Sequence, residues 1–330
     1  MSDSCLNDTD PEWFNKTDMS IQNCTLSTTD LAVGIVSLVV SFIGLLGNGT
    51  VFCFLTFWIK RNRFTIYILN LSVADFIFLL CCVIGVLCLF VVHYEPSLQY
   101  DDAFRLTLNV FFSFGYNMSL YLLTAISVER CLSVIFPMWY QCRRPKHQSL
   151  ITCCLLWVLS LVVTSVEFSC IEEDHVHKGP SSPCENAVFI FMCLLNFLIF
   201  TPLMVVSGLT LLIRVQRDSL MRQSSKLYVI VIATVVIFLI FALPMRLVSL
   251  LNYQHLEYSD NLALLTVLFS TISSSLNPFV YFFVGGQWKW SKRASMQSVL
   301  QTAFKDETDS TQTGTDSVVS TTTSECPELK

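Results

Sequence analysis

The amino-acid sequence predicts an all-α membrane protein: a bundle of seven transmembrane helices with an eighth, amphipathic helix on the inner leaflet. Of its 330 residues, 53% are hydrophobic and only 14% are charged, whereas soluble domains carry about 25% charged residues. The apolar residues form long continuous runs. Because only helices and closed barrels satisfy every backbone polar group in lipid, runs of this length favour a helical bundle.

Seven apolar runs reach the length of a membrane-spanning helix. A hydrocarbon core of ~30 Å requires about 20 predominantly apolar residues in a helix. In chain order, the predicted spans are residues 31–59, 65–92, 104–134, 149–168, 187–214, 227–252 and 261–283. The last three contain Pro202, Pro244 and Pro278. Each proline removes a backbone hydrogen bond and is expected to bend its helix.

The polar region before the bundle, residues 1–30, is predicted to be extracellular and glycosylated. It carries three Asn-X-Ser/Thr triplets, which begin at Asn7, Asn15 and Asn23. Such triplets are acceptor sites in exposed chain. The predicted bundle itself then occupies residues 31–283.

The chain after the bundle is predicted to form two further regions. Two glycines end the last span, and residues 284–304 then mix aromatic and apolar side chains with bases, such as Trp288 and Lys289. This composition is typical of a helix that lies on a membrane surface. Residues 305–330 are rich in Ser, Thr and acids and are predicted to be a disordered tail with phosphorylation acceptors.

Basic residues gather on one side of the predicted membrane. The loops after spans one, three and five and the segment after span seven carry most of them, whereas the opposite loops carry Lys178 and almost no other base. The residues concerned are Lys60, Arg61, Arg63, Arg143, Arg144, Lys146, Arg217, Arg222, Lys226, Lys289, Lys292 and Arg293. Since basic loops remain in the cytoplasm, the chain is expected to be a multi-pass plasma-membrane protein with an extracellular N-terminus and a cytoplasmic C-terminus.

The charged residues that lie within apolar material include Glu129, Arg130 and Asp75. A charge at the centre of a membrane helix costs roughly 2.5 to 3.5 kcal/mol on insertion scales, so these residues are functional candidates. The alternative for Arg130 is a base that extends to the interface.

A set of short motifs, nearly one in every span, resembles the rhodopsin-like (class A) G-protein-coupled receptors. The motifs are Gly47-Asn48, Leu71-Ser72-Val73-Ala74-Asp75, Glu129-Arg130-Cys131, Trp157, Pro202, Pro244 and Asn277-Pro278-Phe279-Val280-Tyr281. Longer runs such as TAISVERCLSV and SSLNPFVYFFVG are similar to the Mas-related receptors, nearest the Mas branch.

The resemblance implies a non-enzymatic receptor that activates heterotrimeric G proteins, of the q/11 or i type. In it, Glu129 would hold Arg130 at rest, and Asn277, Pro278 and Tyr281 would belong to the same switch. The Ser/Thr-rich tail would bind receptor kinases and arrestin, and a role in nociceptive sensory neurons is an expectation from relatives. No nucleic-acid partner is expected.

Two residues are the candidate ligand contacts. Relatives bind cationic ligands through a Glu near the end of span four, which corresponds to Glu167. Arg246 follows Pro244 by two residues and can bind a carboxylate through two hydrogen bonds, although a base extending to the outer surface is the alternative. We therefore expect a peptide or a small cationic or zwitterionic ligand. Ala242 stands where the wider rhodopsin-like family usually has a tryptophan, so the resemblance implies that another side chain couples the ligand to the switch.

The resemblance also implies an ion site and a disulfide. In relatives a polar cluster holds an allosteric sodium ion, and its counterparts are Asp75, Asn48, Ser119, Ser273 and Asn277. A protonated or water-bonded Asp75 is the alternative, and no other metal or cofactor is expected. Mas-related receptors bridge the outer ends of spans four and five by a disulfide. The matching pair is Cys170 and Cys184, with two free thiols as the alternative.

A membrane transporter or channel is the competing class. It predicts inverted repeats, broken helices or a polar path across the membrane. No repeat is evident, and the intramembrane charges lie near the two ends apart from Asp75. An intramembrane enzyme requires a nucleophile with a base, but all five histidines lie in or beside loops.

Overall fold

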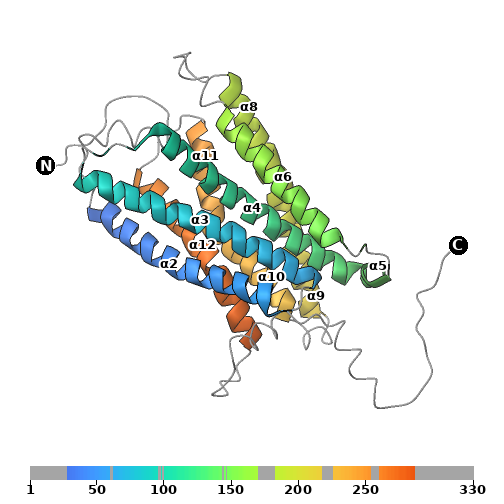
Figure 1. Cartoon of the computed structure of the whole chain (residues 1–330). Helices are drawn as coiled ribbons and strands as arrows, with labels where there is room; N and C mark the ends of the chain where they lie inside the picture. Colours follow the sequence, from blue (N-terminus) through green and yellow to red (C-terminus); the bar gives the residue numbers. More distant parts are fainter. Residues whose placement is uncertain are drawn as a thin grey trace, which may run out of the picture.

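The chain folds into long helices that lie side by side (Figure 1). The computed structural model describes residues 28–59, 62–95, 98, 100–142, 145, 147–169, 183–217, 226–253 and 260–286. Within these residues, seven helical spans are long and apolar enough to cross a membrane. The predicted number of spans is confirmed, and their boundaries agree with the prediction to within a few residues.

The first four spans are single α-helices. They are α2 (Thr28–Phe57), α3 (Arg63–Tyr94), α4 (Asp102–Ile135) and α6 (Gln148–Ser169). Asn62 is the N-cap residue of α3. Its side chain accepts hydrogen bonds from the backbone N–H groups of Phe64 and Thr65. In return, the Thr65 hydroxyl accepts from the Asn62 N–H at 2.8 Å. This reciprocal arrangement is a capping box.

The fifth and sixth spans are each interrupted by a π-helical segment. The fifth consists of α8 (Pro183–Met192), η1 (Cys193–Phe200) and α9 (Thr201–Arg217). The sixth consists of α10 (Lys226–Ile237), η3 (Phe238–Ala242) and α11 (Leu243–Tyr253). The wide turns end with backbone bonds from Thr201 to Asn196 and from Leu243 to Phe238. They precede Pro202 and Pro244, and such local π adjustment re-satisfies backbone groups freed by proline in membrane helices.

The seventh span is α12 (Asp260–Gly286), and it contains Pro278 without interruption. It runs on past Phe283, where the bundle was predicted to end, as far as Gly286. The predicted surface helix beyond it, the tail and the glycosylation triplets lie outside the described residues. A short helix that the sequence did not predict, α5 (Pro137–Cys142), follows α4.

Helix α4 is the centre of the bundle. Its spanning window is 72% buried, against 22 to 56% in the other spans, and it contacts α3, α6, α9 and α10. Close approach to α3 is possible at Gly115, where an added Cβ would lie 2.9 Å from the backbone nitrogen of Phe78. Small residues at such crossings let membrane helices approach closely.

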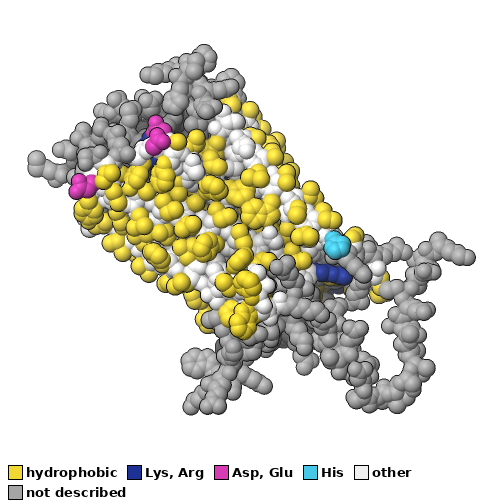
Figure 2. Space-filling model, in the orientation of Figure 1, with side chains coloured by type: hydrophobic (Ala, Val, Ile, Leu, Met, Phe, Trp, Pro, Cys, Tyr) yellow, Lys and Arg dark blue, Asp and Glu magenta, His cyan; other side chains and the backbone are white. Residues whose placement is uncertain are grey.

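Apolar side chains cover the flank of the bundle (Figure 2). Leu46, Leu155 and Leu198 are each more than 60% exposed. So large an apolar surface would be a liability in water, whereas a bilayer solvates it. The chain is therefore a multi-pass integral membrane protein. On the visible face, acidic side chains with some basic atoms beside them lie near one end of this flank, and further basic atoms with a histidine lie near the other (Figure 2).

Candidate functional site

Helix α4 carries or contacts most of the predicted functional residues, at three levels along the bundle. We call the end that contains Glu129, Arg130 and α5 the α5 end, and the opposite end, which contains Glu167 and Arg246, the Glu167 end. Asp75 lies between the two.

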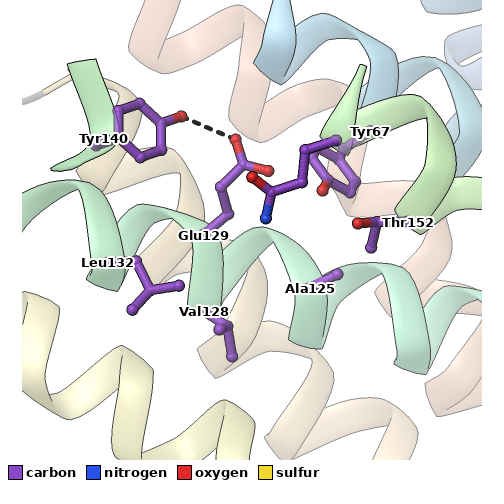
Figure 3. Close-up of a pocket in the computed structure, with 8 residues that line it drawn as sticks. Tyr67, Ala125, Val128, Glu129, Leu132, Tyr140 and Thr152 are labelled. Carbon is purple, nitrogen blue, oxygen red and sulfur yellow. Dashed lines mark hydrogen bonds between the residues drawn. The ribbon is translucent and has the colours of Figure 1, made fainter. Parts of the chain in front are cut away.

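At the α5 end, Glu129 and Arg130 are both buried, at 7% and 4% exposure. Glu129 Oε1 accepts a hydrogen bond of 2.9 Å from the Tyr140 hydroxyl of α5, as Figure 3 shows. The Arg130 guanidinium lies over the ring of Phe64, with its Cζ 4.4 Å from the ring centroid. The predicted pairing of Glu129 with Arg130 stays a prediction, because the contacts described for these two side chains are with aromatic residues.

A cavity of about 120 Å³ lies beside Glu129. It is bounded by α3, α4, α5 and α6, and Figure 3 shows the Glu129 carboxylate between Tyr140 on one side and Tyr67 and Thr152 on the other. Its lining residues are Tyr67, Ala125, Val128, Glu129, Leu132, Tyr140, Gln148 and Thr152. The sequence did not single out Tyr140. The sequence feature that could have pointed to Tyr140 is its position in the loop directly after span three.

At the middle level, Asp75 is fully buried. Its two carboxylate oxygens accept hydrogen bonds from the Ser119 hydroxyl at 2.8 Å and from the Asn277 amide at 2.7 Å. Three helices, α3, α4 and α12, therefore meet at this carboxylate. Three of the five predicted residues are brought together here.

Among the described residues, the other two predicted members of the cluster donate no hydrogen bond to the carboxylate. The Asn48 amide donates to the carbonyl oxygens of Gly44 and Ser274, at 3.0 and 3.2 Å, so this residue ties α2 to α12. Its Oδ1 is a buried acceptor without a hydrogen-bond partner among the described residues. Ser273 is buried, but in α12 it is Ser274 that interacts with Asp75.

Of the remaining switch residues, Pro278 packs where α12 meets α2 and Tyr281 lies in the core. Tyr281 is 1% exposed. The ring of Pro278 lies against Gly47, where an added Cβ would come within 3.1 Å of the proline. The Asn277-Pro278-X-X-Tyr281 motif thus contributes one side chain to Asp75, one to the α2 contact and one to the core.

At the Glu167 end, the two candidate ligand residues contact each other. Arg246 Nη1 lies 3.2 Å from Glu167 Oε1, and the side chains are only 4% and 9% exposed. Arg246 Nη2 also donates to Asn117 Oδ1, and the Asn117 amide donates to Glu167 Oε2 at 3.4 Å. The result is a buried cluster of α4, α6 and α11 in which Asn117 bridges both charges. The sequence reasoning missed Asn117, although a polar residue inside an apolar span was a signal.

Only one of the two cysteines of the predicted disulfide belongs to the residues that the structure describes. Cys184 is disulfide-bonded, but Cys170 lies outside the described residues. Its pairing with Cys170 stays a prediction. In the part of the chain that the structure describes, no group of three or more His, Cys, Asp or Glu residues is placed to hold a metal ion.

The arrangement of seven spans with these motifs agrees with a family model. Residues 47–281 match the 7 transmembrane receptor (rhodopsin family) model. The chain belongs to this family.

Curated relatives place this rhodopsin-family receptor in the Mas-related group. It is 47% identical to "Proto-oncogene Mas" of Rattus norvegicus over 296 residues, which cover 87% of this chain and 89% of that protein. It is 48% identical to "Proto-oncogene Mas" of Homo sapiens over 275 residues, 81% and 82% of the two chains. "Mas-related G-protein coupled receptor member H" of Mus musculus is 45% identical over 298 residues, 89% of each.

Membership of the rhodopsin family fixes the class of function. The protein is a G-protein-coupled receptor, it is not an enzyme, and its partners include heterotrimeric G proteins. The transporter or channel alternative is not favoured.

Proposed function

We propose that this receptor senses a zwitterionic ligand, a peptide or a small molecule with separated charges, at the Glu167–Arg246 pair. The Glu167 end faces the extracellular medium, and the α5 end faces the cytoplasm. The observation that supports the ligand class is the buried ion pair itself, at 3.2 Å. A ligand ammonium takes over Glu167 while a ligand carboxylate takes over Arg246, so neither charge is left buried alone.

Exchange of partners is what makes this ligand class favourable. Removing one member of a buried ion pair leaves an uncompensated charge, which is strongly destabilising. A ligand with a single charge would separate Arg246 from Glu167 and neutralise only one of them. A zwitterion neutralises both. Asn117, which hydrogen-bonds to both side chains, then keeps the two charged side chains in position.

Ligand binding shifts the population of the receptor toward its active state. In that state Arg130 faces the G protein, which is of the q/11 or i type. The Ser/Thr-rich tail binds receptor kinases and arrestin, and the receptor acts in nociceptive sensory neurons. By linkage, the G protein also raises the affinity for the ligand.

An allosteric sodium ion at Asp75 belongs to the same proposal. The oxygens of Asp75 and Ser119 lie together, and the buried Asn48 Oδ1 is an acceptor that an ion or its water can use. These oxygen groups fit a hard cation. A bound sodium ion supplies a positive charge between α3, α4 and α12 and favours the resting arrangement.

The ligand proposal is tested with a screen of basic and angiotensin-like peptides in a G-protein nucleotide-exchange assay. Each active peptide is then assayed with free ends, with an acetylated N-terminus and with an amidated C-terminus. We expect Arg246→Gln to weaken the response to the free peptide by roughly 30-fold or more and to have little effect on the amidated one. Likewise, Glu167→Gln should weaken the response to the free peptide and have little effect on the response to the acetylated one.

The matched control is the exposed pair Asp102 and Arg105 at the same end of the bundle, with side chains 89% and 31% exposed. Asp102→Asn and Arg105→Gln should leave the concentration dependence unchanged. If Glu167→Gln and Arg246→Gln behave like these controls at equal surface expression, the ligand does not bind at this pair.

A further inference from the structure

The sixth span carries Ala242 two residues before Pro244, at the end of its π-helical segment. In this chain Ala242 is the last residue of η3 and is 3% exposed. Its methyl group is too short to reach the candidate ligand site, so a contact between that site and this segment requires a side chain from another helix.

Tyr116 of α4 makes such a contact. It is 3% exposed, and its hydroxyl donates a hydrogen bond of 2.8 Å to the carbonyl oxygen of Ala242. Its ring lies 6.0 Å from the ring of Phe238, the first residue of η3, and 6.2 Å from that of Phe78 of α3. Tyr116 therefore contacts both ends of the π-helical segment at once.

The same ring also contacts the candidate ligand site. Arg246 lies over it, with Cζ 4.9 Å from the ring centroid, at a distance where a guanidinium is attracted to an aromatic face. Arg246 follows Ala242 by one helical turn. One tyrosine side chain is thus held by the ligand-site arginine on its ring face and by the sixth span at its hydroxyl.

The bond to Ala242 falls where the sixth span is best able to move. Mid-helix π segments are frequent at functional sites, and Pro244 directly follows Leu243, the cap of η3. A hydrogen bond from α4 to this segment holds the sixth span against the centre of the bundle. Loss of the bond frees the span to pivot there.

We propose that Tyr116 couples the Glu167–Arg246 site to the π-helical segment Phe238–Ala242. A ligand carboxylate draws Arg246 off the ring, the ring turns, and the hydroxyl leaves the Ala242 carbonyl oxygen. The α10 half of the span then moves away from α4. The trigger in this sequence rests on the proposed ligand site, but the resting contact between Tyr116 and Ala242 does not.

The test uses the full-length receptor in lipid nanodiscs with purified G protein and no agonist. Tyr116→Phe removes the hydroxyl and keeps the ring. Because a neutral hydrogen bond is lost from the resting state alone, basal nucleotide exchange should rise about fivefold. The control is Tyr121→Phe: this buried tyrosine of α4 directs its hydroxyl to Asn196 of the fifth span instead. Its removal should leave basal exchange unchanged, and equal exchange in the two variants would overturn the proposal.

A double-mutant cycle separates coupling from a merely structural effect. The background is Glu167→Gln with Arg246→Gln, which removes both charges and the cation over the ring. If Tyr116 acts through Arg246, Tyr116→Phe should change basal exchange less than twofold in this background. Independent, multiplicative effects would overturn the coupling. No agonist enters either measurement, so an incorrect ligand assignment shows only in the peptide assays, and an incorrect role for Tyr116 shows only here.

Discussion

The hydroxyl of Tyr140 donates a hydrogen bond to Glu129 across 2.9 Å, which joins the short helix α5 to the acid beside Arg130. Tyr140 is also held from α3, because Arg63 Nη1 donates to its carbonyl oxygen at 3.3 Å and the guanidinium lies 5.8 Å from its ring centroid. Helix α5 is thus fixed to two spans through one residue.

Tyr140→Phe should raise basal nucleotide exchange. The substitution keeps the ring under Arg63 but leaves Glu129 without the phenol hydrogen bond, and a hydrogen bond to a charged group contributes about 1.5 kcal/mol or more, which is about tenfold in an equilibrium. Tyr94→Phe is the control, because that tyrosine is 69% exposed at the far end of α3. Unchanged exchange in Tyr140→Phe would show that this contact does not favour the resting state.

Asp75→Asn should abolish the response of the receptor to sodium. We expect sodium chloride to lower basal exchange of the wild type relative to choline chloride at equal ionic strength, because the cation favours the resting arrangement. The variant keeps a side chain of the same shape but removes the charge that attracts the ion. Asp102→Asn, which changes an exposed carboxylate, should respond like the wild type. A sodium response that survives in Asp75→Asn would rule out this site.

Gly44→Ala should destabilise the folded receptor. A Cβ at this position would lie 2.2 Å from the Ser275 hydroxyl oxygen, 2.7 Å from Leu79 Cδ1 and 2.9 Å from Ser275 Cβ, so these side chains or the helices that carry them must shift to accept it. Overpacking of this kind typically costs about 1 to 3 kcal/mol. Gly49→Ala on the same helix is the matched control, because its nearest contact would be 3.7 Å away. Thermal unfolding in nanodiscs should show a lower midpoint for the first variant alone.

The spans could be predicted from the sequence because lipid imposes a length and an apolar composition on each of them. The site residues on the shared motifs, such as Asp75 and Asn277, could be predicted as well, and the structure brings these two into contact. Glu167 and Arg246 were predicted as separate ligand contacts. Their mutual contact could not be predicted, because they are 79 residues apart on different spans.

The contacts between side chains on different spans depend on how each helix is rotated about its axis, which the sequence does not determine. Where every face of a span is apolar, hydrophobic periodicity does not set which residues face inward, and close contacts set it instead. The contact at Gly115 fixes how α4 meets α3, and it is a property of the pair of helices. The choice between Ser273 and Ser274 at Asp75 depends on one residue of such rotation in α12.

The π-helical segments have a consequence for the phase of the spans that contain them. Each α-helical residue advances around the axis by roughly 100°. A π-helical turn contains an extra residue, so each of its residues advances by a smaller angle. A helical wheel drawn from Lys226–Ile237 therefore loses its register at Phe238–Ala242. Arg246, on the far side of this break, points at Glu167 and Asn117. One residue deleted from Phe238–Ala242 should close the wide turn into regular α-helix and keep Arg246 on the face that meets both.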